Sequence, residues 1–282
     1  MERINVKNRV FWYFKLMTQL TILVVVCSAC WEKKKKKYIV KTSMIQVDSL
    51  NQIELLKDTL VTPKLYSHLP GLEKVPSEKA RNIFISALLP SILVAKYELS
   101  QTKLQVEELS EKEIWSTEDS LFFVATKLRF KASDLDDLKK RIGWLPNSIV
   151  LAQAAVESAW GQSRFFLQAN NVFGIWSYNK NEPRMKAGLI RKNEAKQVHV
   201  KVYENFEQAI LNYFEILSTA NAYKTLREAR LETQDPFKLL PHLKNYSEQR
   251  TAYTNLLQSV IVRYNLTEYD RYQIHPEYIV AQ

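Results

Sequence analysis

One glutamate stands near the end of a stretch that is otherwise uncharged. Residues 145–161 read LPNSIVLAQAAVESAWG, and Glu157 is the one charged side chain among them. Pro146 and the small residues predict a closely packed helix that ends near Gly161. Glu157 then lies in the last turn, where the helix dipole and burial beside Trp160 both raise its pKa. Such a carboxyl group suits a general acid at neutral pH, and an exposed glutamate in a surface ion pair is the alternative.

A second group of candidate residues follows in the segment 170–176, which reads NNVFGIW. Paired asparagines before a Phe-Gly turn predict a constrained loop. Amide side chains bind sugar hydroxyls, and flat aromatic rings stack on the apolar faces of sugars. We therefore expect Asn171, Phe173 and Trp176, together with Trp160, to contact a carbohydrate. For Phe173 an ordinary place in the core is the favoured alternative.

These residues together resemble a known signature. The string QAAVESAWG (153–161), followed by Ser163-Arg164 and by NNVFG (170–174), is similar to the motif of the glucosaminidase-type peptidoglycan hydrolases of glycoside hydrolase family 73, and most similar to their Bax-type branch. Ala159 stands where that motif usually has glycine. The similarity covers about residues 78–266.

The resemblance implies a fold and a reaction. The fold is a mainly α, lysozyme-like helical domain with a small β-hairpin beside the cleft. The reaction cleaves a glycosidic bond in the N-acetylglucosamine–N-acetylmuramic acid backbone of peptidoglycan, most directly as an endo-β-N-acetylglucosaminidase. Glu157 maps onto the family's general acid.

The second catalytic group is less clearly marked. Glycoside hydrolysis ordinarily uses two carboxyl groups, or else the acetamido group of the substrate replaces the second one. In several family members the second acid lies in the hairpin, where this chain offers Glu194 and, more distantly, Glu182. Glu194 stands in a turn rich in Lys and Arg, so a solvated charge is the slightly favoured alternative.

A tyrosine is a further candidate. The segment LKNYS (243–247) resembles the tyrosine-bearing segment of the family, and it places Tyr246 at the cleft, where its hydroxyl would orient the substrate or Glu157. Without the resemblance, a helix cap or a core position is the commoner role for such a residue.

Two other functions stay open, and two kinds of site are not expected. A lytic transglycosylase also uses one glutamate in a lysozyme-like fold, and an envelope lipoprotein could bind peptidoglycan without cleaving it. The histidines show no metal-ligand spacing, both cysteines lie near the N-terminus, and no glycine-rich phosphate loop is present. We therefore predict neither a metal nor a cofactor.

The N-terminus predicts export. A basic region reaches Lys15, residues 16–26 are mostly apolar, and Cys27-Ser-Ala-Cys30 follows. This pattern predicts a signal peptide over residues 1–29 and resembles the lipobox of bacterial lipoproteins, with Cys30 as the site of lipid attachment. Cys27 stands where the lipobox usually has an aliphatic residue, and an uncleaved anchor is the alternative. Both place the body in the cell envelope outside the cytoplasm, on the periplasmic side in a Gram-negative cell.

The net charge of +10 belongs mainly to the same region. Residues 1–37 hold nine basic and two acidic side chains, so they account for most of the excess. The run Lys33 to Lys37 predicts a solvated tether over residues 30–76 that contacts anionic lipid headgroups. The expected partners are thus peptidoglycan and, through the lipid anchor, a membrane, whereas no nucleic-acid partner is expected.

Residues 77–282 are expected to form the glucosaminidase domain. Apolar periodicity predicts a helix from Ser77 that Pro90 kinks or ends, and a hairpin within residues 184–203. Further helices are predicted over residues 120–131, from 133, over 145–161, over 206–217 and over 253–264.

Overall fold

The computed structural model describes residues 37–188 and 197–282 of the chain. Tyr38–Val280 form one compact unit, and the second unit, Met1–Lys37 with Ala281–Gln282, lies almost wholly outside the described residues. The helices of the compact unit are α2 (Ser77–Glu111), α3 (Thr117–Phe130), α4 (Leu135–Arg141), α5 (Asn147–Ser158), α6 (Arg164–Ala169), α7 (Phe206–Thr219), α8 (Lys224–Glu232), α9 (Pro236–Leu239) and α10 (Thr251–Arg263). Short 3₁₀ turns join them, among them η3 (Leu240–Tyr246) and η4 (Leu266–Arg271).

Four pairs of short strands accompany the helices. They are β1 (Tyr38–Val40) with β8 (Ile279–Ala281), β2 (Ser43–Ile45) with β4 (Lys64–Tyr66), β3 (Leu60–Val61) with β7 (Gln273–Ile274), and β5 (Arg184–Lys186) with β6 (His199–Lys201). The β2–β4 and β3–β7 pairs are parallel, and β5–β6 is an antiparallel hairpin. The predicted fold class, mainly α with one small hairpin, is confirmed in these elements.

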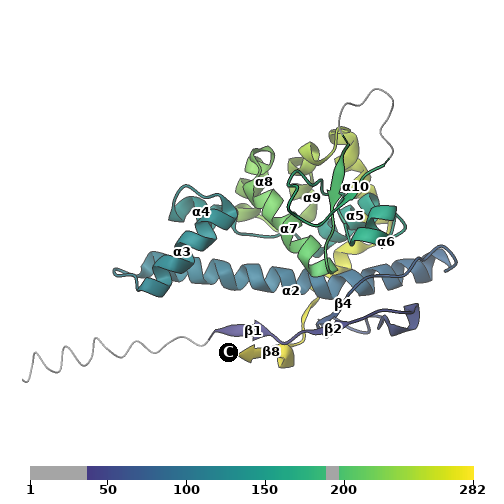
Figure 1. Ribbon diagram of the computed structural model, residues 1–282, viewed down its shortest axis with the longest axis horizontal. Coiled ribbons are helices and arrows are strands. Elements are labelled where there is room, and N and C mark those ends of the chain that lie inside the picture. Colours follow the sequence, from purple (N-terminus) through teal and green to yellow (C-terminus); the bar gives the residue numbers. More distant parts are fainter. Residues whose placement is uncertain (1–36, 189–196) are drawn as a thin grey trace, which may run out of the picture. The chain divides into compact units, whose positions relative to one another are not determined.

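Helix α2 runs through the middle of the compact unit. It contacts α4, α5 and α7 on one side and the strands β1, β4 and β7 on the other (Figure 1). By length and composition it is the one helix of the described residues that could cross a membrane, with a mean hydropathy of 1.5 in its most apolar window, but 78% of that window is buried inside the protein. The helix therefore serves as the central core element.

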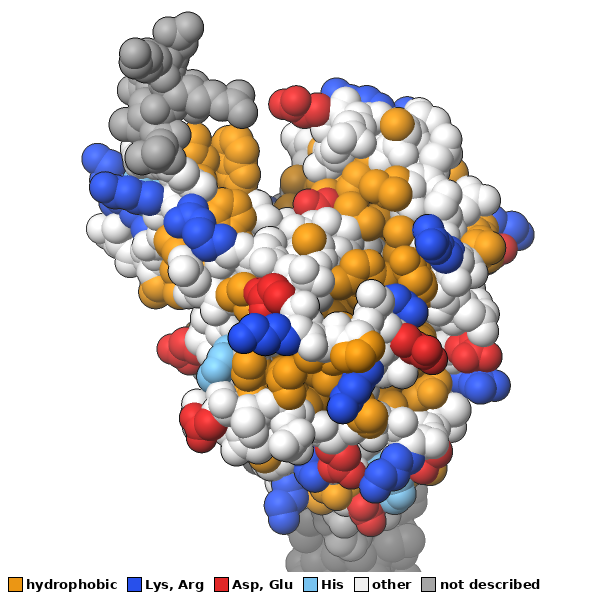
Figure 2. Space-filling view, turned by 90° about the vertical axis from the view of Figure 1, so that its right-hand side faces the viewer, with side chains coloured by type: hydrophobic (Ala, Val, Ile, Leu, Met, Phe, Trp, Pro, Cys, Tyr) orange, Lys and Arg blue, Asp and Glu red, His pale blue; other side chains and the backbone are white. Residues whose placement is uncertain are grey.

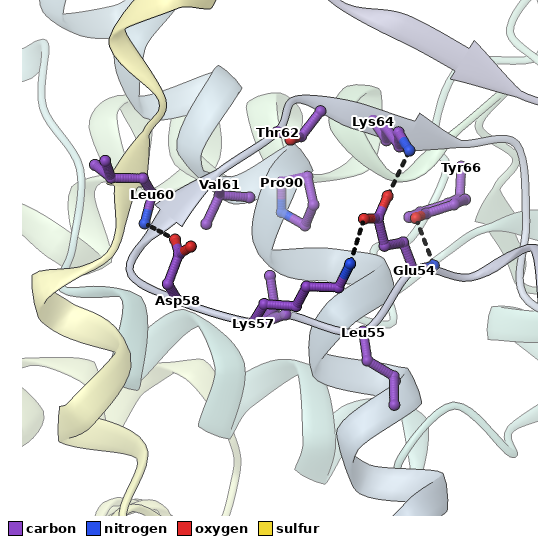
Figure 3. Close-up of a pocket in the computed structure, with 11 residues that line it drawn as sticks. Glu54, Leu55, Lys57, Asp58, Leu60, Val61, Thr62, Lys64, Tyr66 and Pro90 are labelled. Atoms are coloured by element: carbon purple, nitrogen blue, oxygen red, sulfur yellow. Dashed lines mark hydrogen bonds and ion pairs between the residues drawn. The ribbon is translucent and has the colours of Figure 1, made fainter.

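The prediction that Pro90 ends or kinks the first helix is wrong about the ending. Helix α2 continues through Pro90 as one element of 35 residues. A proline inside a helix loses a backbone hydrogen bond and crowds the preceding turn, but here the ring is buried against the segment 54–66 (Figure 3). In the same region Ser86 Oγ accepts a hydrogen bond from the backbone N–H of Leu56 at 3.2 Å. Tertiary packing thus holds the helix together.

The segment between Tyr38 and Pro76 differs from the predicted tether. It belongs to the compact unit and pairs with strands from the C-terminal end of the chain. Ion pairs join Glu54 to Lys57 and Lys64, and the Tyr66 hydroxyl accepts from the Glu54 N–H at 3.0 Å (Figure 3). Its buried apolar side chains are Val47, Ile53, Val61, Leu65, Tyr66, Leu69 and Leu72. The lysine-rich run ends at Lys37, and folded structure begins directly after it.

The helices predicted from periodicity are present. Helix α5 packs against α2, α10 and η4, and Asn147 to Ala155 are all buried. Pro146 precedes α5 and has no side chain to cap it. Instead Asp270 of η4 accepts hydrogen bonds from the backbone N–H and the hydroxyl of Ser148, each at 2.7 Å. A carboxylate here satisfies free N–H groups and matches the helix dipole, so the start of α5 is held firmly.

Candidate active site

The end of α5 is a sharp reversal directly after Glu157. The helix ends at Ser158, whose hydroxyl donates to the Ala154 carbonyl and accepts from the Gly161 N–H at 2.9 Å. Ala159, Trp160 and Gly161 then all adopt positive φ, at 51°, 56° and 81°. Left-handed backbone costs a non-glycine residue roughly 1 kcal/mol, which explains why a glycine would fit at Ala159. The predicted place of Glu157 in the last turn is therefore correct.

Glu157 lies between a tyrosine hydroxyl and a glycine. The hydroxyl of Tyr253, in the first turn of α10, donates to Glu157 Oε1 at 2.8 Å. A Cβ atom placed on Gly174 would lie 3.9 Å from Oε2 of the same carboxyl group. Burial raises the pKa of Glu157, and the hydrogen bond from Tyr253 partly opposes that rise because it favours the charged form. The predicted direction of the pKa shift is thus present, and burial is its first cause.

A buried polar chain leads to this carboxyl group. The Tyr213 hydroxyl of α7 donates to Gln153 Oε1, and Gln153 Nε2 donates to the Tyr253 hydroxyl at 3.0 Å. Gln153 precedes Glu157 by four residues, so the two side chains share one face of α5. Gln153 is 0% exposed and Tyr253 is 3% exposed. Because Gln153 fills the acceptor position of the Tyr253 hydroxyl, the proton of that hydroxyl is directed to Glu157.

The loop of residues 170–176 is constrained, as predicted, but by its own side chains. Asn171 is 1% exposed; its amide donates to the carbonyls of Ile175 and Lys201, and its carbonyl oxygen accepts from the Ile175 N–H. Phe173 is 2% exposed and stacks on Tyr213 with ring centroids 4.1 Å apart. The structure buries both residues, so the prediction that Asn171 and Phe173 contact a sugar directly differs from what is found. For Phe173 the favoured alternative, a place in the core, is confirmed. Both side chains shape the loop.

Tyr246 supports this loop and does not bond to Glu157. Its hydroxyl donates to the backbone carbonyl of Phe173 at 3.0 Å. Its ring stacks on Tyr253 with centroids 5.8 Å apart and an interplanar angle of 7°. Tyr246 therefore lies beside the site, as the sequence predicted, and it positions the Phe173 loop and the Tyr253 ring, while Tyr253 takes the contact with Glu157 that was expected of Tyr246.

The two candidate tryptophans have different surroundings. The Trp160 ring packs edge-on against Phe84 and Tyr264, with ring centroids 5.5 and 4.9 Å away. These three rings form a cluster separate from the stacked pair of Tyr246 and Tyr253. Trp176 is 54% exposed and pairs through its backbone with Val200 of β6. Figure 2 shows a hollow between the arm formed by this hairpin and the helical body, with hydrophobic side chains along both sides. Trp176 is thus free to contact a ligand.

The hairpin carboxylates fall into two groups. Glu194 lies outside the described residues. Glu182 accepts from the Ser177 hydroxyl at 2.7 Å and pairs with Lys201 at 3.3 Å. Burial acts to raise the pKa of Glu182, but the hydrogen bonds from Ser177 and Lys201 outweigh it and lower the pKa overall. Glu182 is therefore an ionised group that braces the hairpin.

Sequence reasoning missed Tyr253 and Gln153. The sequence predicts a helix over residues 253–264 and a motif over residues 153–161, and it marks neither Tyr253 nor Gln153 as a site residue. A signal existed for both, because a buried tyrosine hydroxyl or amide needs a polar partner. Gln153 also stands one helical turn before the single glutamate of the segment. Among the described residues no group of three His, Cys, Asp or Glu side chains could hold a metal.

Part of the chain matches the model of a known protein family. Residues 132–266 match the model of the glucosaminidase family, described as mannosyl-glycoprotein endo-beta-N-acetylglucosaminidase. The chain is similar to the exo-glucosaminidase LytG of Bacillus subtilis, 25% identical over 207 residues that cover 68% of each protein. It is also similar to protein Bax of Escherichia coli, 23% identical over 206 residues that cover 68% of this chain and 72% of Bax.

The chain is also similar to two solved structures. The catalytic domain of the autolysin Auto from Listeria monocytogenes has a TM-score of 0.38 and 22% identity, over 59% of this chain and 96% of that domain. The glycoside hydrolase domain of FlgJ from Salmonella typhimurium has a TM-score of 0.35 and 22% identity, over 52% of this chain and 88% of that domain.

Proposed function

The chain belongs to the glucosaminidase family through residues 132–266, and from this premise we propose that Glu157 is the general acid of its reaction. The protein is a glycoside hydrolase that acts on the glycan backbone of peptidoglycan, in the cell envelope outside the cytoplasm. The observation that supports Glu157 is its setting: a partly buried carboxyl group with a raised pKa that faces Tyr253 and Gly174. Such a group stays protonated to a higher pH than an ordinary glutamate.

The proposed cleavage begins with proton transfer from Glu157 to the glycosidic oxygen. As the bond breaks, Glu157 becomes a carboxylate, and the hydrogen bond from Tyr253 stabilises that charge. Tyr246 holds the Phe173 loop beside the reacting sugar, and Trp176 binds the glycan strand on the hairpin side. Trp160 is half-buried, and it contacts the glycan through the part of its ring that Phe84 and Tyr264 leave exposed.

The second catalytic group is either Glu194 or the substrate itself. Glu182 is a poor candidate because Ser177 and Lys201 already occupy its oxygens. If Glu194 does not act, the acetamido group of the substrate attacks its own anomeric carbon, and Glu157 then suffices as the one protein carboxyl group.

The test is digestion of purified peptidoglycan sacculi by the full-length protein. We expect Glu157→Gln to lower kcat by roughly 10²- to 10⁴-fold, which is the usual contribution of a general acid, while Glu182→Gln serves as the matched hairpin control. Glu194→Gln separates the two routes, because a loss comparable to that of Glu157→Gln would favour two carboxyl groups. Full activity of Glu157→Gln would contradict the assignment.

The products identify the reaction class. Mass spectrometry of the released muropeptides should show new reducing N-acetylglucosamine ends, as expected of an endo-β-N-acetylglucosaminidase. Anhydro-muramic ends would instead indicate a lytic transglycosylase. If the wild-type protein binds sacculi but releases no new ends, it is a peptidoglycan-binding lipoprotein without this activity.

We further propose that residues 1–29 are a signal peptide and that the protein is attached to a membrane through a lipid on Cys30. Both lie outside the described residues, and the proposal rests on the sequence pattern alone. Cys30→Ser should abolish incorporation of labelled fatty acid and release the protein from the membrane fraction, whereas Cys27→Ser should keep both. Retention of Cys30→Ser in the membrane would favour an uncleaved anchor.

A further inference from the structure

Two aromatic side chains are strongly exposed on the segment that follows the Phe173 loop. Trp176 is 54% exposed and Tyr178 is 85% exposed, and their ring centroids lie 6.4 Å apart with an interplanar angle of 41°. Tyr178 has no part in the proton transfer proposed for Glu157. Large aromatic groups left in solvent side by side are a common mark of a binding surface.

The backbone that carries these rings is fixed. The Ser177 N–H donates to the His199 carbonyl at 2.8 Å, and the Lys201 N–H donates to the Ile175 carbonyl at 3.0 Å. Ser177 Oγ donates to Glu182, which locks the turn beyond Tyr178. In an extended strand alternate side chains point to the same face. Trp176 and Tyr178 therefore share one face of the hairpin, and Ser177 points to the other.

The face of the hairpin that carries Trp176 and Tyr178 also carries side chains of both of its strands. Trp176 pairs with Val200, and Val200 pairs with Met185, so these three side chains lie on one side of the small sheet. Figure 2 shows hydrophobic side chains on the side of the hairpin arm that faces the hollow. The exposed large apolar groups that the structure describes in this hairpin are Trp176 and Tyr178.

The backbone geometry also limits how far Tyr178 lies from Glu157. Gly174 adjoins the Glu157 carboxyl group, and Tyr178 follows Gly174 by four residues. Because Ile175 and Ser177 pair with β6 as an extended segment, which rises by about 3.3 Å per residue, the Cα atoms of Gly174 and Tyr178 lie on the order of 10 Å apart. That distance is longer than one sugar ring. A sugar over Tyr178 would therefore belong to the same glycan strand as the bond at Glu157 but would stand further along it.

We propose that Trp176 and Tyr178 form an aromatic platform that binds sugar rings of the glycan strand away from the cleaved bond. The apolar C–H faces of the sugars stack on the two rings, and the Tyr178 hydroxyl hydrogen-bonds with ring substituents. Because a short fragment cannot reach from Glu157 to Tyr178, the platform makes the enzyme favour long strands over short ones. This inference rests on the proposed function of Glu157.

The test compares strand lengths. Full-length wild-type protein, Tyr178→Ala, Trp176→Ala and Tyr178→Phe act on peptide-free glycan strands separated into long and short fractions. For Tyr178→Ala and Trp176→Ala, kcat/KM on long strands should fall, mainly through KM, and the ratio of long- to short-strand kcat/KM should drop by about tenfold, the scale of one lost aromatic contact. Tyr178→Phe should keep most of that ratio because it keeps the ring. An unchanged ratio in Tyr178→Ala would overturn the platform.

Tyr38→Ala is the control, because Tyr38 is also a solvent-exposed tyrosine, 45% exposed, but lies on β1 and not on the hairpin. It should leave the long-to-short ratio as in the wild type. A fall in that control equal to the fall in Tyr178→Ala would mean that the assay reports surface apolarity in general, and would overturn the assignment.

Binding separates this inference from the proposed function. In the Glu157→Gln background, Tyr178→Ala should weaken binding to peptide-free long strands by about tenfold. Weakened binding to whole sacculi with unchanged binding to peptide-free strands would show that the rings bind stem peptides, and would overturn the glycan platform. Undiminished hydrolysis by Glu157→Gln alone would refute the general acid, whereas unchanged binding of the strands after Tyr178→Ala in an inactive Glu157→Gln background would refute the platform.

Discussion

At the scale of single residues, two opposed influences act on the carboxyl group of Glu157. Burial raises its pKa and keeps it protonated, whereas the hydrogen bond from Tyr253 favours the carboxylate and lowers the pKa. A general acid needs burial before the reaction, to keep its proton, and a hydrogen-bond donor during the reaction, because negative charge develops on the carboxyl group as the proton leaves. Burial also raises the pKa of Tyr253, with the charge of Glu157 as the next cause, so this tyrosine remains a donor.

The Tyr253→Phe variant tests this balance. The change removes the donor and keeps the ring, so the pKa of Glu157 should rise further. Because the general acid works only while protonated, the alkaline limb of the pH–rate profile should move to higher pH. At the same time kcat should fall by roughly 10- to 100-fold, since the carboxyl group loses its orientation and the stabilisation of its charge. The measurement is the rate of sacculus digestion across pH.

Tyr246→Phe is the control for that measurement. It also removes a hydroxyl from the stacked pair, but that hydroxyl bonds to the Phe173 carbonyl and not to Glu157. Its profile should keep the alkaline limb of the wild type even where the rate falls. An alkaline limb that stays in place in Tyr253→Phe would show that the hydrogen bond does not tune Glu157.

The difference between these tyrosines marks how far sequence could predict the site. The raised pKa of Glu157 follows from local facts: one acid, an apolar helix, and a turn directly after it. Which hydroxyl reaches the acid depends on how α10 packs on α5, and Tyr246 and Tyr253 are only seven residues apart. The sequence likewise shows that Asn171 carries a polar amide. It does not show that two backbone carbonyls and a backbone N–H group already form hydrogen bonds with that amide.

At the scale of elements, prediction succeeded where the signal lies within one segment. Helices α5, α7 and α10 and the β5–β6 hairpin follow the apolar periodicity of their own residues. Pro90 is the instructive failure. A proline is a local signal to stop a helix, yet the packing that offsets it comes from residues 54–66, which no pattern within α2 reveals.

The elements also explain why the site is rigid. Helix α5 is held at its start by Asp270 of η4 and ends in three residues with positive φ. Asn170 at the start of the Phe173 loop donates to the carbonyls of Ser67 and Tyr203, which ties that loop to the N-terminal segment and to the end of the hairpin. The carboxyl group and the loop that faces it are thus positioned by separate, independently braced supports.

At the scale of the whole molecule, the N-terminal segment and the C-terminal end complete the fold together. Strands β1, β3, β7 and β8 are two or three residues long and pair across most of the chain. Strands of this length carry too few residues for an alternation pattern to be recognised, and their partners lie far away in sequence. This is why the segment after Lys37 was predicted to be a tether, although it carries core residues.

A truncation tests that conclusion. A chain of residues 77–282 lacks the whole segment 38–76, whose seven buried apolar side chains lie against the core. Burying one such side chain contributes about 1.5–3 kcal/mol, so their loss removes on the order of 10 kcal/mol, comparable to the entire stability of an ordinary domain. A chain of residues 38–282 should therefore unfold cooperatively on heating, whereas the shorter chain should be unfolded or aggregated and should not digest sacculi. Both are measured by circular dichroism and by the sacculus assay. Equal melting temperatures of the two chains would mean that residues 38–76 are a tether after all, packed on a domain that does not need them.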